Sequence, residues 1–231
     1  MIPTQLPLGL RLPAASRFDN FVAGPNRETV TAIEQLTLDR TASVLFITGA
    51  AGSGKTHLLQ AACRAVETGG EAAVYLPLTT FSTMNPGILE GLEHYALIAL
   101  DDVQAIAGQV DWEEALFHLY NRLREAQGRL LAAAAAPPDQ LNIELPDLRS
   151  RLGWGAVYAL QLPDDAMRLQ ILALRAQACG LELPDETARY LLRRCPRDLP
   201  ALIALLERLD HAALAAQRRL TVPFVKAVLE S

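Results

Sequence analysis

The segment GAAGSGKT (49–56) has the residue types and the spacing that bind phosphate groups. Its Gly49, Gly54, Lys55 and Thr56 match the P-loop pattern in full. In such a loop, glycines let backbone N–H groups curl around phosphate oxygens, a lysine supplies positive charge, and a threonine hydroxyl ligates Mg²⁺. A strand pattern enters the segment and a helical pattern leaves it, as the motif requires. The segment therefore predicts bound ADP or ATP with Mg²⁺, held by Gly49, Ala50, Ala51, Gly52, Ser53, Gly54, Lys55 and Thr56.

The segment LIALDD (97–102) is an apolar strand pattern that ends in two acidic residues. A carboxylate at the carboxyl end of a strand that neighbours a P-loop lies where a magnesium ion would sit. We therefore predict that Asp101 and Thr56 are metal ligands, and that Asp102 orients a water molecule as a catalytic residue. Without the P-loop, the two acids would be interpreted as a polar strand end that faces solvent.

The histidines add little to this site. His57 directly follows the P-loop threonine and is a candidate nucleotide contact, with a histidine on the helix surface as the alternative. The other three, His94, His118 and His211, share no ligand spacing, and the chain has no Cys-x-x-Cys pair. We therefore assign no metal to histidine or cysteine.

Five short apolar segments must position these motifs, and helical patterns lie between them. Continuous apolar runs of this length are typical of parallel strands buried on both faces. The strands are predicted at 43–48, 72–77, 95–101, 129–135 and 156–162. Between the third and fourth of them, a helix at 113–128 carries one apolar stripe. The alternation predicts an α/β sandwich with a five-stranded parallel sheet.

After Pro163 the strand patterns stop and helical patterns follow. Four helices are predicted in this part of the chain, at 164–180, 185–195, 199–217 and 222–230. We therefore expect a small all-helical subdomain after the sheet. The predicted organisation is a flexible leader at 1–16, an α/β core at 17–162 and the helical subdomain at 163–231.

Composition sets limits on function and location. The chain has 231 residues, 51% of them hydrophobic, so a sizeable core is available. A formal charge of −5 argues against a protein that coats DNA by itself, because that role needs a basic surface. The three cysteines are an odd count and indicate reduced residues of a cytoplasmic protein. No segment is long and apolar enough for a transmembrane helix.

Taken together, the motifs resemble those of AAA+ proteins, and more narrowly the nucleotide-binding region of the bacterial replication initiator DnaA. RFDNFVAGPNRE (17–28) resembles the segment that lines the adenine pocket, LDDVQ (100–104) the acidic strand end, and LRSRLGWG (148–155) the arginine-finger box. The resemblance covers the core and makes the helical subdomain its lid. It implies nucleotide contacts from Phe21 and Asn26, and a catalytic finger at Arg151.

An arginine finger acts on nucleotide held by a neighbouring subunit, where it stabilises charge on the transferring phosphate. The alternative for Arg151 is a surface arginine near the start of a strand. Only the arginine-finger interpretation requires a partner chain that holds the nucleotide.

Within this family the sequence is most similar to the Hda group of regulators, in which the lid is not followed by a DNA-binding domain. LYNRL (119–123), LLRRC (191–195) and AAQRRLTVPFVKAVLE (215–230) also resemble that group. The resemblance implies two partners, the DnaA initiator and the sliding clamp (beta subunit) of DNA polymerase III. It further implies little or no sequence-specific DNA binding, and it leaves self-association open.

The leader segment QLPLGL (5–10) resembles the clamp-binding peptide of the Hda group. Such a peptide docks in an extended conformation, with Gln5 hydrogen-bonded and Leu6, Leu8 and Leu10 in apolar pockets. The alternative is an apolar leader without a partner.

Two AAA+ elements depart from the family pattern. The polar residue expected at the end of the fourth strand aligns with Ala135, and the lid arginine aligns with Pro200. Neither side chain can sense a γ-phosphate, although Arg197, one turn earlier, is a substitute to consider. We expect nucleotide to be held but hydrolysed poorly. The complete P-loop leaves slow ATP turnover open, and with it the choice between ADP and ATP at rest.

The sequence thus predicts a negative regulator of chromosome replication initiation. In this hypothesis a nucleotide-bound AAA+ adaptor binds the DNA-loaded sliding clamp and stimulates hydrolysis of ATP held by the DnaA initiator. A stand-alone AAA+ ATPase such as a helicase loader is the main alternative. An adaptor that uses nucleotide only to stay folded is a third.

Overall fold

The computed structural model describes residues 16–39, 43–195, 198–216 and 218–230. Within them, five parallel strands form one sheet in the order β2-β3-β4-β1-β5. The strands are β1 (Ser43–Thr48), β2 (Ala73–Pro77), β3 (Leu97–Asp101), β4 (Arg129–Ala134) and β5 (Ala156–Ala159). Every residue of β3 and β4 is buried, as expected for central strands covered on both faces. The predicted five-stranded parallel sheet is confirmed.

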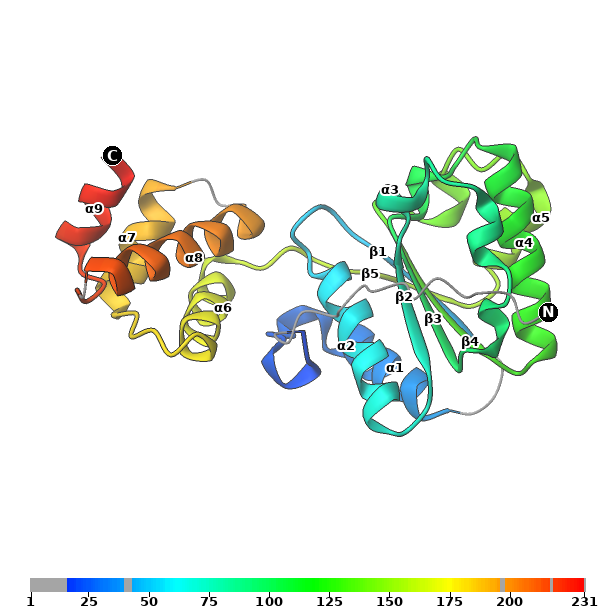
Figure 1. Cartoon of the computed structure of the whole chain (residues 1–231), viewed down its shortest axis with the longest axis horizontal. Helices are drawn as coiled ribbons and strands as arrows, with labels where there is room; N and C mark the ends of the chain where they lie inside the picture. The colour runs from blue at the N-terminus through cyan, green and yellow to red at the C-terminus, as the bar shows by residue number, and fades with distance from the viewer. Residues whose placement is uncertain (1–15, 40–42, 196–197, 217, 231) are drawn as a thin grey trace.

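Helices cover both faces of the sheet, as Figure 1 shows. One face packs against α1 (Arg27–Leu38) and α2 (Lys55–Thr68) in a buried cluster that includes Ile33, Leu58 and Ala99. The other face carries α3 (Leu78–Phe81), α4 (Val110–Glu125) and α5 (Pro146–Leu152). Its cluster includes Phe46, Leu100 and Leu116. Because side chains alternate along a strand, neighbouring residues of the same strand serve the two clusters.

The last strand is shorter than predicted, because β5 ends at Ala159 instead of residue 162. Leu160 still donates its N–H to the Thr48 carbonyl, at 2.7 Å. Gln161 then leaves the ladder, and its backbone bonds with the side chain of Asn26. From this point the chain continues into the helical part.

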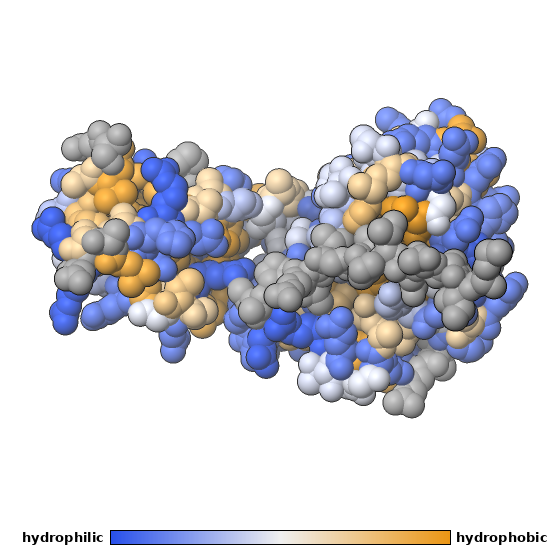
Figure 2. All heavy atoms as spheres, in the orientation of Figure 1, coloured by the Kyte–Doolittle hydropathy of each residue, from blue (hydrophilic) through white to orange (hydrophobic). Residues whose placement is uncertain are grey.

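The C-terminal part consists of α6 (Asp165–Ala178), α7 (Asp185–Arg194), α8 (Leu199–Ala216) and α9 (Val222–Glu230) among the described residues. It has a separate buried cluster that includes Leu172, Leu191, Leu206 and Val225. Figures 1 and 2 show it as a second body joined to the first by a narrow waist. The predicted all-helical subdomain is confirmed, and it follows an α/β sandwich, as the sequence predicts. The division at residues 16/17 and 162/163 stays a prediction.

Two glycines mark where the lid approaches the core. A Cβ on Gly24 would lie 2.6 Å from Sδ and Cε of Met167, which belongs to α6. A Cβ on Gly52 would lie 3.1 Å from Cδ of Pro200, which is in the first turn of α8. The beginnings of α6 and α8 therefore lie against the edge of the sheet where β1 ends.

The described residues lack both a membrane-spanning helix and a cluster of metal-binding side chains. No helix in them is long and apolar enough to cross a membrane. Nor do they contain a cluster of three or more His, Cys, Asp or Glu residues that would hold a metal ion. All three cysteines are free: Cys63 is buried, Cys195 is half-buried and Cys179 is exposed at the end of α6.

Candidate functional site

The turn between β1 and α2 adopts a conformation that depends on glycine. Gly52 and Gly54 have φ angles of 79° and 98°, in the left-handed region that favours glycine. A Cβ on Gly49 would lie 2.6 Å from the Ser53 hydroxyl, so the loop has no room for a side chain there. These constraints explain the glycines of the motif and leave backbone N–H groups at the start of α2.

Two polar side chains of the turn are available for a phosphate group. Lys55 is buried, and its ammonium donates to the carbonyls of Gly49 and Ala50 at 2.6 and 3.2 Å. Ser53 is buried as well, and its hydroxyl has no hydrogen-bond partner among the described residues. A buried hydroxyl without a partner, a lysine curled over the loop and a helix N-terminus together fit a phosphate group.

Asp101, at the carboxyl end of β3, lies beside the P-loop threonine. Its Oδ2 accepts hydrogen bonds from the hydroxyls of Thr56 at 2.6 Å and Tyr75 at 2.9 Å. Its Oδ1 accepts from the backbone N–H of Asp102 at 3.1 Å. The residue is only 2% exposed, and this burial raises the pKa of its carboxyl even though the hydroxyl donors act in the opposite direction.

The structure thus brings together Thr56 and Asp101, the two predicted magnesium ligands. A hydroxyl and a carboxylate supply the oxygen ligands that Mg²⁺ prefers. The residues present fit the ion, and metal binding itself stays a prediction.

Asp102 is held by a neighbour that sequence analysis missed. Asp102 has a φ angle of 57°, and its Oδ1 accepts from Gln104 Nε2 at 2.8 Å. The other end of the Gln104 amide accepts the backbone N–H of Ala135 at 3.1 Å. Gln104 therefore connects the predicted water-orienting acid to the residue that follows β4. The signal in the sequence was its place two residues after Asp102.

Ala135 and Pro200 occupy places close to the site. Ala135 directly follows β4, and Pro200 lies over Gly52 of the P-loop. Neither offers a charged or polar side chain, which agrees with the departures seen in the sequence. Arg197, the predicted substitute, lies outside the described residues.

Two of the other predicted nucleotide contacts lie beside the P-loop. The rings of Phe21 and His57 have centroids 5.4 Å apart, and a Cβ on Gly54 would lie 2.6 Å from Cε2 of Phe21. His57 Nε2 lies 2.8 Å from the Arg17 carbonyl oxygen. Burial lowers the pKa of His57, so the neutral imidazole is favoured.

Asn26 is placed differently. Its side-chain amide donates to the Gln161 carbonyl at 3.0 Å and accepts the Gln161 N–H at 2.8 Å. Asn26 is buried, and this pair of bonds ties the start of α1 to the segment that leads into the lid. Its amide therefore has a structural partner in this chain, and its contact with nucleotide stays a prediction.

Arg151 lies far from the P-loop, at the opposite edge of the sheet. It is in the last turn of α5, shortly before β5 begins, whereas the P-loop follows the carboxyl end of β1. A strand of six residues spans roughly 17–20 Å, which sets the scale of this separation. The structure therefore does not bring Arg151 together with the other predicted site residues.

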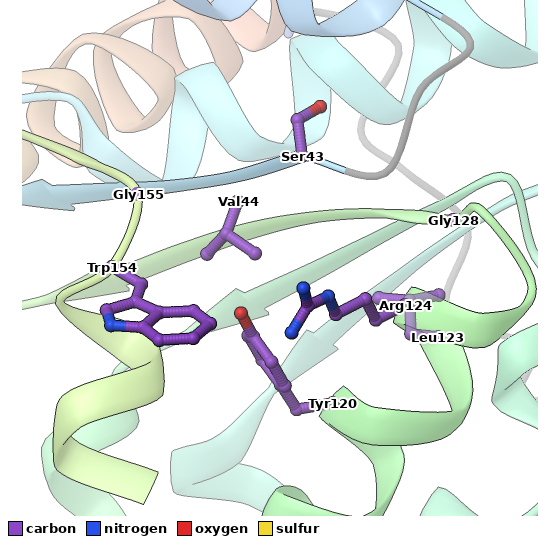
Figure 3. A pocket seen from close by; sticks show the side chains of 8 residues that line it. All are labelled: Ser43, Val44, Tyr120, Leu123, Arg124, Gly128, Trp154 and Gly155. Atoms are coloured by element: carbon purple, nitrogen blue, oxygen red, sulfur yellow. The ribbon is translucent and has the colours of Figure 1, made fainter.

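The Arg151 guanidinium carbon lies 4.6 Å from the ring centroid of Trp154 and 5.7 Å from that of Tyr120. Both rings also line a pocket at the amino-terminal edge of the sheet, shown in Figure 3. The pocket has a volume of about 200 Å³. Its lining comes from the amino ends of β1, β4 and β5 and from α4: Ser43, Val44, Tyr120, Leu123, Arg124, Gly128, Trp154 and Gly155.

The predicted clamp-binding residues cannot be placed, because Gln5, Leu6, Leu8 and Leu10 lie outside the described residues.

A P-loop at the carboxyl edge of a parallel sheet, followed by a helical lid, defines the AAA+ class of nucleotide-binding proteins. The chain belongs to the family of bacterial DnaA ATPase domains, whose model matches residues 12–159. Residues 165–229 match the model of the Hda lid domain. The chain is therefore an Hda-like, DnaA-related AAA+ protein, in a family of replication initiation regulators.

Solved structures share the fold of this chain. Domain III of the Thermotoga maritima replication initiation protein DnaA matches with a TM-score of 0.84 at 24% identity, over 95% of this chain and 98% of that one. A DnaA initiator bound to AMPPCP and single-stranded DNA matches with a TM-score of 0.63 at 26% identity, over 89% and 69%. The RuvB Holliday junction branch migration motor of Thermotoga maritima shares the fold, with a TM-score of 0.69 at 17% identity over 95% and 72%.

Proposed function

We propose that this chain is a nucleotide-bound AAA+ adaptor that binds the DNA-loaded sliding clamp and stimulates hydrolysis of ATP held by the DnaA initiator. It would thereby inactivate the initiator and act as a negative regulator of chromosome replication initiation. The observation that carries the proposal is the position of Arg151, at the edge of the sheet opposite to the chain's own P-loop.

The separation of the two edges supports an action of Arg151 on the nucleotide of another chain. A guanidinium stabilises a transferring phosphate only in direct contact with it. Because Arg151 is separated from Lys55 and Thr56 by the length of β1, it acts on nucleotide bound to a different chain. The family of the chain supports the DnaA initiator as that partner.

The chain's own nucleotide has a different part in this proposal. ADP or ATP would be held by the P-loop backbone, Lys55 and the Ser53 hydroxyl, with Phe21 and His57 beside it. Mg²⁺, when bound, neutralises phosphate charge, and Thr56 and Asp101 are its ligands. Two solved structures of the related DnaA initiator contain AMPPCP, which supports an adenine nucleotide here.

We expect little hydrolysis of that nucleotide. Ala135 and Pro200 stand where a polar sensor and a lid arginine are expected, and neither contacts a γ-phosphate through a charge. The nucleotide would then join lid and core as a lasting component of the protein.

We propose that the leader segment binds the sliding clamp. QLPLGL (5–10) supports it by its resemblance to clamp-binding peptides, with Gln5 and the three leucines as the contacts. Binding to the clamp would bring the finger to initiator molecules near replicating DNA. Since these partners are bacterial replication proteins, we place the chain in the cytoplasm. Self-association through the finger edge is a further part of the proposal.

The experiment that tests the proposal measures ATP hydrolysis by purified DnaA initiator in the presence of DNA-loaded clamp, with and without this chain. We expect the wild type to accelerate hydrolysis, and both Arg151→Ala and the double variant Gln5→Ala/Leu6→Ala to fail. Arg149→Ala is the matched control, because Arg149 is exposed on the same short helix. No acceleration by the wild type, or full activity of Arg151→Ala, would contradict the proposal.

The second candidate function is a stand-alone ATPase such as a helicase loader. The observation in its favour is the complete set of Lys55, Thr56, Asp101 and Asp102, with Gln104 holding Asp102. This candidate predicts intrinsic ATP turnover that Lys55→Ala abolishes and Arg151→Ala leaves unchanged in the monomer. Turnover of the chain alone, without an effect on the initiator, would favour it.

A further inference from the structure

The guanidinium of Arg151 lies close to two aromatic rings of its own chain. Arg151 lies 4.6 Å from the Trp154 ring centroid and 5.7 Å from that of Tyr120. A second guanidinium, that of Arg124, lies 5.5 Å from the Trp154 ring. Trp154 is 64% exposed, which is unusual for so large an apolar side chain. This exposure calls for a reason other than core packing.

The backbone around Trp154 is fixed by the close approach of the turn between α5 and β5 to the start of β1. A side chain on Gly155 would clash with the carbonyl of Val44, so β1 and this turn touch along their backbones. The N–H of Trp154 donates to the Arg151 carbonyl at 3.2 Å. The indole is therefore held next to the start of β1, as Figure 3 shows, even though its surface is exposed.

Stacking on this ring restricts the arginine. A guanidinium within about 6 Å of an indole centroid is attracted by the ring's negative face. A free arginine side chain samples many rotamers, and this freedom is lost when the finger meets a phosphate. If the rotamers are already restricted, less is lost in the transition state and the rate is higher.

We propose that Trp154 is a positioning residue for Arg151: its indole, which lines the amino-edge pocket, holds the guanidinium over its ring for contact with the nucleotide of the partner chain. Arg124, on the same ring, supports the position of the indole. This inference rests on the proposed function, since it assigns Trp154 to the same finger. A direct contact between Trp154 and the partner protein is the competing explanation.

The kinetic test separates positioning from contact. In the hydrolysis assay with initiator and loaded clamp, we expect Trp154→Ala to lower the maximal stimulated rate about 2- to 5-fold, the effect of an exposed cation–π contact. The concentration for half-maximal stimulation should not change. Trp154→Phe, which keeps an aromatic face, should retain most of the rate. Combined with Arg151→Ala, the Trp154→Ala change should have no further effect. A raised half-maximal concentration with an unchanged maximal rate would overturn the inference.

A second measurement needs no initiator. The Arg151 Nε–Hε signal in an NMR spectrum of the whole chain, assigned by its loss in Arg151→Lys, reports the mobility of the guanidinium. We expect restricted motion and a ring-current shift in the wild type, and the loss of both in Trp154→Ala. Arg124→Gln should have a smaller effect in the same direction. An Arg151 signal that is equally ordered without the indole would overturn the inference, whatever the hydrolysis assay shows.

The two measurements also distinguish the failure of the inference from that of the proposed function. If the wild type does not stimulate the initiator, the proposed function fails, and the NMR result alone decides whether Trp154 positions Arg151. If the wild type stimulates but Trp154→Ala raises the rate, the ring restrains the finger in an unproductive place. That result would overturn positioning and leave the proposed function intact.

Discussion

The two edges of the sheet are built in contrasting ways. At the carboxyl edge, Asp101 is 2% exposed and accepts three hydrogen bonds, and Lys55 is buried against loop carbonyls. At the amino edge, Arg151 stacks on a tryptophan that is 64% exposed. One edge is enclosed and polar, whereas the other is open and aromatic.

The contrast indicates what each edge is for. An enclosed site with fixed donors suits a ligand that stays, because electrostatic contacts are strong where water is excluded. An open surface with a guanidinium on a ring suits a partner that arrives and leaves. In a parallel sheet both edges come from the same strands, so one small domain offers the two kinds of site at once.

The largest expected effect comes from a substitution at the amino edge alone. Arg151→Ala should lower stimulated hydrolysis by about 10³-fold or more, as the loss of a finger does in other nucleotide hydrolases. Nucleotide affinity of the chain itself should stay unchanged, because Arg151 lies at the opposite edge from Lys55. The hydrolysis assay checks the loss of stimulation, and calorimetric titration with ADP checks that the nucleotide affinity is unchanged. A variant that loses its own nucleotide would show that the two edges are not independent.

The next effect concerns a buried carboxylate of α4, that of Glu113. Glu113 is 1% exposed, and its carboxylate accepts backbone N–H groups from Gly108, Glu144 and Leu145 at 2.7, 3.1 and 2.7 Å. These bonds anchor the loop from which α5, the helix that carries Arg151, begins.

Glu113→Ala leaves buried donors unpaired and should cost about 2–4 kcal/mol, which lowers Tm by about 4–16 °C. Glu113→Gln keeps one acceptor and should lose less. Thermal unfolding of the two variants checks that Glu113→Ala lowers Tm more than Glu113→Gln does. An unchanged Tm for Glu113→Ala would contradict the anchoring role of Glu113.

Removing the lysine tests the carboxyl edge. Lys55→Ala should weaken ADP binding by roughly 10- to 150-fold, the effect of losing a charge-assisted hydrogen bond worth about 1.5–3 kcal/mol. The stacking of Arg151 on Trp154 should persist, since neither ring nor guanidinium contacts the P-loop. Titration measures the first effect, and the Arg151 NMR signal measures the second. Unaltered ADP affinity would exclude the P-loop as the nucleotide site.

A smaller change tests how Asp101, the predicted metal ligand, is held. Tyr75→Phe removes one of the two hydroxyls on Asp101 Oδ2 and keeps the ring. The loss of one hydrogen bond, about 0.5–1.5 kcal/mol, should change the Mg²⁺ dependence of nucleotide binding about 2- to 10-fold. Affinity measured in EDTA should be unaffected, and it serves as the control. An equal change with and without Mg²⁺ would mean that Tyr75 acts on the fold instead of the carboxylate.

The smallest effect is a dependence of stability on pH. Burial lowers the pKa of His57 from its usual value of 6.5, so below that value the unfolded chain binds more protons than the folded one. Stability should therefore fall as the pH decreases from about 7.5 to 5.5, by at most about 2–4 °C in Tm. Asp101, whose pKa is raised by burial, acts with the opposite sign. His57→Gln should flatten the profile, and a slope identical to that of the wild type would assign the effect elsewhere.

The sequence predicted most of the sheet, because buried parallel strands are continuous apolar runs. The first strand was predicted at 43–48, as observed, and the third began two residues early, at 95 instead of 97. Errors arose where a partner far along the chain decides the structure. The prediction for the last strand ran to residue 162, although Gln161 is bound by Asn26. The short helix α5 was not predicted as an element, since seven residues carry little periodicity.

The residues of the candidate site also differ in whether the sequence could predict them. The P-loop is contiguous, so its residues were found from spacing alone. Tyr75 and Gln104 were missed because their roles depend on which strands are neighbours: β2 lies next to β3, and the end of β4 lies next to Gln104. No pattern along the chain shows that a tyrosine on one strand reaches a carboxylate on the next. Register between strands is a property of the fold.

The strand order has a consequence for the newly made chain. β1, which leads into the P-loop, pairs only with β4 and β5 among the described strands, and both are made much later. During synthesis β1 therefore has no neighbour until most of the core has left the ribosome, and contacts between distant segments form slowly. β2 and β3, in contrast, pair with each other as soon as both exist. A nascent chain cut short before residue 129 would lack the partner that holds its phosphate loop in place.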